Sequence, residues 1–146
     1  MPLSFSAPVP MNRSAVASAG HTVLVVEDEI ELSRLFIEVL NESAHTAIPA
    51  YSVSDALSVI AHQRFDAAIL DVELRDGPVF PVADRLAALG TPFLFASAVY
   101  YQVVPRAHQQ VPFVSKPFDV KVLQQRVEEA LARPPASSGG VKAAGD

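Results

Sequence analysis

The sequence contains no cysteine. This absence excludes a disulfide-stabilised scaffold, a thiol nucleophile and any metal or cluster site that needs a thiolate ligand. Basic runs are also absent: 11 Lys and Arg stand against 16 Asp and Glu, which gives a formal net charge of −5. Because nucleic-acid binding depends on clustered Lys and Arg that neutralise phosphates, we expect no nucleic-acid partner.

Long apolar stretches are lacking as well. No segment approaches the ~18–20 apolar residues that span a bilayer, and the N-terminus has no apolar core behind a basic start, as a secretory signal would have. The sequence therefore predicts a cytoplasmic protein with no membrane partner. No G-x-G-x-x-G or G-x-x-x-x-G-K-[ST] loop follows the first apolar run, which argues against a flavin- or nucleotide-binding module.

Half of the 146 residues are hydrophobic, which suits one folded domain. Composition predicts its boundaries. Residues 1–20 are rich in Pro, Ser and Ala, and their apolar residues show no regular helical or strand spacing. Residues 134–146 begin with two prolines and continue mainly with small residues. We expect a disordered leader and a disordered tail there. The predicted domain covers residues 21–133, which hold nine Lys and Arg against fifteen Asp and Glu.

Within this domain, short apolar runs alternate with helical patterns. The runs are rich in Val, Ile and Phe, which favours strands buried on both faces; they cover residues 21–26, 45–50, 66–70, 92–96 and 111–114. Apolar residues at three- and four-residue spacing predict helices over 32–40, 56–60, 82–89 and 120–131. Ser52, with Asp55 three residues on, forms a capping-box pattern before the second of these helices, and Gly90 is a candidate C-cap of the third. Between Ser97 and Lys116 the apolar stripe is poor and Pro105 interrupts it, so we expect at most two mobile turns. The alternation predicts an α/β sandwich with a parallel sheet between helices.

Polar side chains follow four of the predicted strands. Glu27 and Asp28 follow the first, and Asp71, Ser97 and Lys116 follow the third, fourth and fifth. Ligands bind at this edge in open parallel sheets. Two carboxylates ~4 Å apart repel by ~4 kcal/mol at an effective dielectric of ~20, so the group needs a cation. Oxygen ligands favour Mg²⁺, and such a site suits phosphoryl transfer with Asp71 as nucleophile. Lys116 and Ser97 would then contact the phosphoryl oxygens.

These residues resemble the receiver domain of two-component response regulators. The resemblance lies in VLVVEDE (23–29), AAILDVEL (67–74), FLFASA (93–98) and SKPF (115–118), and it extends over essentially all of residues 21–133. It implies a flavodoxin-like (CheY-like) fold with strand order 2-1-3-4-5. It also implies that Asp71 accepts a phosphoryl group from a histidine kinase or a phosphotransfer protein, and that the domain is a phosphoacceptor and not a turnover enzyme.

The resemblance further assigns roles to individual positions. Glu27 and Asp28 match the acidic pair that holds the metal with Asp71, and the backbone carbonyl of Glu73 would be a further ligand. Phe113 matches the switch aromatic. The Lys116–Pro117 bond is a candidate for a cis peptide.

A narrower resemblance concerns FASAVY (95–100) and FPVADRL (80–86), which are similar to the single-domain FAT GUY receivers. It implies a stand-alone shuttle, phosphate sink or protein-binding switch, with Tyr100 as a further switch residue and a downstream protein as a possible partner. Ser97 replaces the Thr of that signature. The sequence departs from ordinary receivers after Asp71, where Leu74 is followed by Arg75 in place of proline.

Other interpretations stay open at this point. Asp28 could be the N-cap of the first helix, Ser97 could cap a helix, and Asp71 could cap a turn. The whole domain could be a phosphate-independent pseudo-receiver that only binds a partner. A small hydrolase is disfavoured, because Asp71-Val72-Glu73 is not the Asp-x-Asp of aspartate-nucleophile phosphatases.

Overall fold

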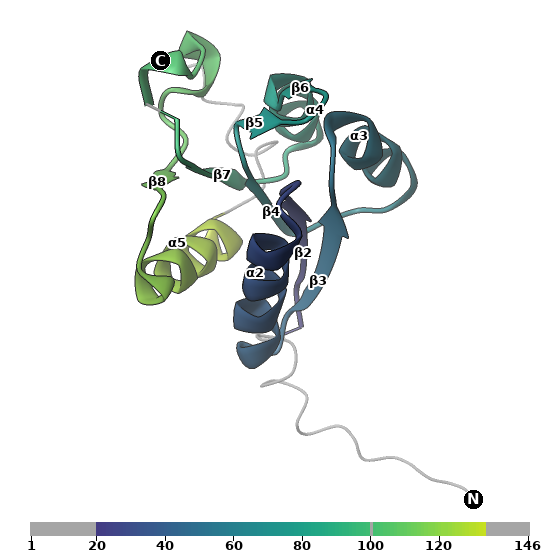
Figure 1. The fold of residues 1–146 in the computed structure, drawn as a ribbon. Coiled ribbons are helices and arrows are strands. Elements are labelled where there is room, and N and C mark those ends of the chain that lie inside the picture. Colours follow the sequence, from purple (N-terminus) through teal and green to yellow (C-terminus); the bar gives the residue numbers. More distant parts are fainter. Residues whose placement is uncertain (1–19, 100, 134–146) are drawn as a thin grey trace, which may run out of the picture.

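The computed structural model describes residues 20–99 and 101–133. Its centre is a parallel sheet of five strands: β2 (Thr22–Val26), β3 (Thr46–Ala50), β4 (Ala67–Leu70), β7 (Phe93–Ser97) and β8 (Phe113–Ser115). The spatial order is β3-β2-β4-β7-β8, which is the predicted 2-1-3-4-5 order (Figure 1). The predicted leader and tail lie outside the described residues, Gly20 excepted, so their disorder stays a prediction.

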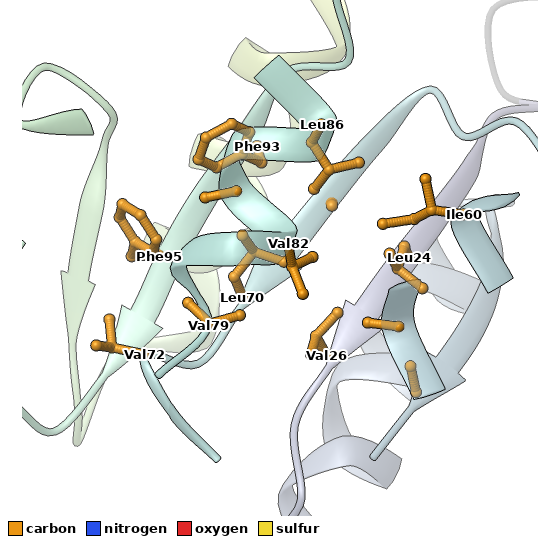
Figure 2. Packing of buried hydrophobic residues seen from close by; sticks show 14 of the residues in the cluster. Leu24, Val26, Ile60, Leu70, Val72, Val79, Val82, Leu86, Phe93 and Phe95 are labelled. Carbon is orange, nitrogen blue, oxygen red and sulfur yellow. The ribbon is translucent and has the colours of Figure 1, made fainter. Parts of the chain in front are cut away.

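Helices cover both faces of the sheet. α2 (Ile30–Glu42) and α5 (Val120–Ala132) pack on one face, and α3 (Val53–His62) and α4 (Phe80–Leu89) pack on the other (Figure 1). Successive residues of a strand point to opposite faces, so β2 contributes to two separate cores. Leu24 and Val26 pack with α3 and α4 (Figure 2), whereas Val23 and Val25 pack with α2 and α5.

Burial distinguishes the central strands from the edge strands. Every residue of β4 and β7 is buried, as the apolar runs predict. The same prediction is wrong for β3 and β8, which are only partly buried because each lies at a sheet edge with a single neighbouring strand. Pro49 is accommodated within β3 for the same reason, because an edge strand tolerates a missing ladder donor.

Local signals in the sequence position the helix ends. The Ser52 hydroxyl accepts a 3.0 Å hydrogen bond from the backbone N–H of Asp55, and the Asp55 carboxylate accepts one from Tyr51 N–H. The predicted capping pattern therefore forms at the start of α3, with the carboxylate reaching one residue further back. Gly90 ends α4 in the left-handed region, at φ 78°, as its place after the helix predicts.

The segment between β7 and β8 forms two short 3-10 turns, η1 (Tyr101–Val103) and η2 (Arg106–His108). The prediction of at most two turns is confirmed; the mobility of the segment stays a prediction. His108 is buried, lies edge-on to Phe93 and Phe95, and its Nε2 lies 2.7 Å from Asp84 Oδ1 in α4. This buried imidazole attaches the segment to the α4 side of the sheet.

A small hairpin that the sequence analysis did not predict follows Asp71. Its strands are β5 (Glu73–Leu74) and β6 (Gly77–Pro78), and Gly77 has φ 136°, which only glycine adopts without strain. Asp76 in its turn accepts hydrogen bonds from the backbone N–H groups of Val53 (2.8 Å) and Ser54 (3.1 Å). The hairpin thus caps the N-terminus of α3 from a distant part of the chain.

We expect Asp76→Ala to lower the melting temperature by a few degrees, because two N–H groups at the start of α3 lose their acceptor. These hydrogen bonds hold the pKa of the Asp76 carboxyl below its ordinary value of 3.8. A carboxyl whose pKa is depressed by folding stabilises the fold above its unfolded-state pKa and loses that contribution at lower pH. The difference between wild type and variant should therefore shrink below pH 3.8 in thermal unfolding. A difference that is unchanged at low pH would contradict this assignment.

No helix in the described part of the chain has the length and apolar character that crossing a membrane requires.

Candidate functional site

The candidate site lies at the carboxyl edge of the sheet, where the strand register brings four chain segments together. Two backbone hydrogen bonds extend the strand pairing one residue beyond β4 and β8: Asp71 N–H donates to Val26 O and Lys116 N–H donates to Ser97 O, each at 2.9 Å. These bonds fix the positions from which the side chains of Glu27, Asp71, Ser97 and Lys116 converge. The predicted convergence is therefore observed.

Asp71 is held by two donors. Ser97 Oγ donates to Asp71 Oδ1 at 2.8 Å, and Lys116 Nζ donates to Asp71 Oδ2 at 3.2 Å. Asp71 is 7% exposed and Ser97 is 1% exposed, so these bonds form in a site with little water. Each of the two carboxylate oxygens of Asp71 therefore has one hydrogen-bond donor in contact.

Lys116 also joins Asp71 to Glu27. Its Nζ donates to Glu27 Oε1 at 2.9 Å, while Glu27 Oε2 accepts a 3.0 Å hydrogen bond from the backbone N–H of Glu29. Burial raises the pKa of Glu27 from 4.5 to about 7, against the lowering effect of its bond to Lys116. Burial lowers the pKa of Lys116, but the hydrogen bonds and charges of Glu27 and Asp71 outweigh it and raise that pKa overall. The ammonium therefore stays charged, while the Glu27 carboxyl titrates near neutral pH.

Three carboxylates form an oxygen-lined group that fits a divalent cation. Glu27, Asp28 and Asp71 each offer one ligand oxygen, and these oxygens lie within 4.8 Å of one another. The donors are all hard oxygens, which suit Mg²⁺, and the half-buried Asp28 leaves one side accessible to water or a phosphoryl oxygen. The residues present fit the predicted ion.

The remaining predicted residues are less closely tied to Asp71. Glu73 is the exposed first residue of β5, and the role of its backbone carbonyl as a ligand stays a prediction. Phe113 is partly buried, with its ring centroid 6.1 Å from Phe95 and 5.9 Å from Tyr101. Tyr100 lies outside the described residues. The Lys116–Pro117 peptide is cis, as the resemblance implies.

Two open interpretations from the sequence are wrong. Glu29, not Asp28, is the N-cap residue of α2, because the chain is still leaving β2 at Asp28. Ser97 does not cap a helix: it is the last residue of β7, and its hydroxyl donates to Asp71. The backbone N–H of Val99 also lies 3.4 Å from Ser97 Oγ, which links the loop after β7 to the same hydroxyl.

Two side chains near the site are not among the site residues that the sequence predicted. Tyr101 lies edge-on to Phe113, and its hydroxyl donates to the backbone carbonyl of Gln109. The His108 ring lies edge-on to Phe95, which pairs with Phe113 across strands β7 and β8. Neither residue belongs to a recognisable sequence motif. Their positions become evident only from contacts with other segments in the folded structure.

Solved structures of known proteins resemble this chain over nearly their whole length. The non-phosphorylated HemR receiver domain of Leptospira biflexa is 27% identical, with a TM-score of 0.67, and the match covers 78% of this chain and 98% of that one. The response regulator protein TrrA of Thermotoga maritima, solved in complex with Mg²⁺ and BeF, is 23% identical, with a TM-score of 0.68 and coverage of 75% and 98%. The fold is that of a CheY-like receiver domain.

Comparison by sequence agrees with this result. The sensory transduction protein LytR of Streptococcus agalactiae is 30% identical over 118 residues, which cover 76% of this chain and 46% of that protein. The chain spans about half the length of the curated relatives it matches. The sequence matches no family model. Together the structural neighbours and the curated names support a response-regulator receiver domain. Membership of the FAT GUY group stays a prediction.

Proposed function

We propose that this receiver domain accepts a phosphoryl group on Asp71 from a phosphohistidine of a histidine kinase or of a phosphotransfer protein. It would act as a relay shuttle, a phosphate sink or a protein-binding switch, and it would not turn over a substrate as an enzyme does. The stand-alone role rests on the FAT GUY resemblance alone. The main support is the position of the Asp71 carboxylate between the Ser97 hydroxyl and the Lys116 ammonium, beside Glu27 and Asp28.

The proposed reaction is an in-line transfer. An Asp71 carboxylate oxygen forms a bond to phosphorus while the P–N bond to the donor imidazole breaks, and the departing ring nitrogen keeps the electron pair and takes up a proton. The product is an acyl phosphate. When bound by Glu27, Asp28, Asp71 and the Glu73 carbonyl, Mg²⁺ supplies positive charge that neutralises the phosphoryl oxygens.

Lys116 and Ser97 are placed to respond to the new group. Lys116 Nζ lies 3.2 Å from Asp71 Oδ2, so a short movement lets it pair with a phosphoryl oxygen as a point charge. The Ser97 hydroxyl would exchange its bond to Asp71 Oδ1 for one to another phosphoryl oxygen. Because the loop at Val99 touches this hydroxyl, the loop would follow, and Phe113 would repack against Tyr101. A downstream protein would recognise that change.

The proposal is tested by incubating the full chain with acetyl phosphate and Mg²⁺ and recording its intact mass. We expect one added phosphoryl group, released by hydroxylamine as an acyl phosphate is, and we expect a chelator to prevent the addition. Borohydride reduction and peptide mapping should locate the group at Asp71. No addition at any donor concentration, with the fold intact by circular dichroism, would instead favour the pseudo-receiver that only binds a partner.

A further inference from the structure

A hollow lies at the opposite edge of the sheet from Asp71. It has a volume of about 620 Å³ and is bordered by residues that precede β2, β4 and β7 and by the C-terminal ends of α3, α4 and α5. Volumes of about 300–1,000 Å³ are typical of small-molecule sites. The phosphoacceptor site has no part in this hollow, so any role for it is separate from the proposed phosphoryl transfer.

The lining of the hollow is positively charged, in contrast to the domain. Residues 21–133 hold fifteen acidic residues against nine Lys and Arg, yet three of those nine, Arg64, Arg85 and Arg133, line this one hollow. His21 and His62 line it too. Among the residues that the structure describes, none of these three guanidinium groups forms an ion pair.

Asp66 is the single acidic residue of the lining, and it is already engaged. Its Oδ2 accepts a 2.8 Å hydrogen bond from the backbone N–H of Thr22 and lies 3.7 Å from His21 Nδ1. The arginines therefore present uncompensated donors to a ligand.

Helix ends explain only part of this charge. A basic residue near a helix C-terminus offsets the partial negative charge there, which accounts for His62 in the last turn of α3 and Arg133 at the C-cap of α5. Arg85 lies in the middle of α4, and Arg64 lies beyond the end of α3. The positive lining exceeds what the helix ends need.

The walls between these charges are apolar. Ile60 and Leu86, which face the core in Figure 2, line the hollow from α3 and α4, together with the buried Phe65. Leu89 at the end of α4 lines the hollow and is 51% exposed, so its side chain is accessible to a ligand. Apolar walls with a few convergent charged groups are the usual composition of a small-molecule site.

We propose that this hollow binds a small organic anion, an apolar or aromatic body with a phosphate, sulfonate or carboxylate group. The apolar body covers Leu89, and the anionic group is bound by Arg64 and Arg85. Guanidinium groups suit this role because their fork of donors matches the oxygens of such anions. The site requires neither Asp71 nor its phosphorylation.

The test uses naphthalene-1-sulfonate, an aromatic anion that cannot donate a phosphoryl group, titrated into the ¹⁵N-labelled full chain. We expect saturable binding of one probe per chain, with amide shifts over residues 62–66 and 89–91 and none at Asp71. Sulfate, which lacks the apolar body, and naphthalene-1-methanol, which lacks the charge, should bind at least about tenfold more weakly. The variant Arg64→Gln/Arg85→Gln should lose about tenfold or more in affinity, since hydrogen bonds to charged groups contribute about this much each.

The matched control is Arg34→Gln/Arg106→Gln, which removes two exposed arginines outside the hollow. This control should keep the wild-type affinity for the probe. Asp71→Asn should keep it as well, because the hollow does not include Asp71. Loss of probe binding can therefore be distinguished from loss of the proposed phosphoryl transfer. Absence of saturable binding, amide shifts elsewhere, or equal weakening in the control pair would overturn the proposal. So would a glutamate-rich peptide that shifts these amides when the naphthalene probe does not, because the occupant would then be an acidic segment of a protein.

Discussion

Asp71→Asn is expected to abolish phosphoryl transfer from acetyl phosphate or from a phosphorylated kinase, to below detection by intact mass or by radiolabel. The amide has no anionic oxygen to attack phosphorus, and no neighbouring side chain can replace it at the same position. Glu27, one of the two other carboxyls at the site, is bonded to Lys116 and to the backbone at Glu29, is 1% exposed, and has a pKa raised to about 7.

The fold of this variant should survive. Asparagine has nearly the shape of aspartate, and its Oδ1 can still accept the hydrogen bond from Ser97 Oγ. The bond from Lys116 Nζ is lost, but the ammonium keeps Glu27 as a partner. We expect a change in the free energy of unfolding of no more than about 1–2 kcal/mol, measured by chemical denaturation.

Asp66→Asn is the matched control, because Asp66 directly precedes the same strand at its other end and accepts a hydrogen bond from Thr22 N–H that asparagine can keep. It should be labelled like the wild type. If Asp71→Asn were labelled equally well, the phosphoacceptor would be another residue and the proposed function would be wrong.

Lys116→Met is expected to reduce phosphoryl transfer at least about a hundredfold, because the variant loses the cation that pairs with the phosphoryl group. It should also destabilise the metal-free fold. Removing one partner of a buried ion pair typically costs ~3–5 kcal/mol, and here Glu27 and Asp71 are left together without the ammonium. Uptake of a proton by Glu27 limits this cost.

The destabilisation should depend on pH in a definite direction. The folded-state pKa of Glu27, about 7, is above the value of 4.5 expected when the chain is unfolded. The folded protein therefore binds more protons than the unfolded one between these values, and its stability falls as pH rises from 4.5 to 7. Without Lys116 the pKa of Glu27 rises further, so the fall continues above pH 7.

Urea unfolding with a chelator at pH 6 and pH 8 measures this effect. The stability lost in Lys116→Met should be larger at pH 8. The control is Lys121→Met, which removes an exposed lysine of α5 and should match the wild type at both pH values. An equal loss at both pH values would contradict the buried pairing of Lys116 with Glu27.

The sequence was informative where chemistry and periodicity act locally. The apolar runs predicted all five strands of the main sheet, and Ser52 and Gly90 predicted their helix ends, because each of these signals lies within a few residues of the structure that it determines. The convergence of Asp71, Ser97 and Lys116 was predictable as well, since parallel strands end at one edge.

Structure that depends on distant partners could not be predicted in this way. The two-residue strands β5 and β6 are too short to give a periodic pattern, and Asp76 caps α3 more than twenty residues away. The contact of His108 with Asp84 joins two segments that neither composition nor spacing relates. The segments of the edge strands β3 and β8 also contain short apolar runs, so their partial exposure became evident only with the strand order.

The two separate cores have a consequence for the direction in which a signal could spread. If Ser97 moves, the loop after β7 and the ring of Phe113 would respond. The apolar side chains of these segments pack into the α3/α4 core: Val99, Val104 and Phe113. Val114 and Leu123 belong instead to the α2/α5 core. We infer that the sheet acts as a partition: repacking around Phe113 would reshape the α4 side and leave the surface of the α2/α5 side largely unaltered. A protein that docks only on the unaltered side would bind both forms with equal affinity, and so could deliver or remove the phosphoryl group without favouring either form.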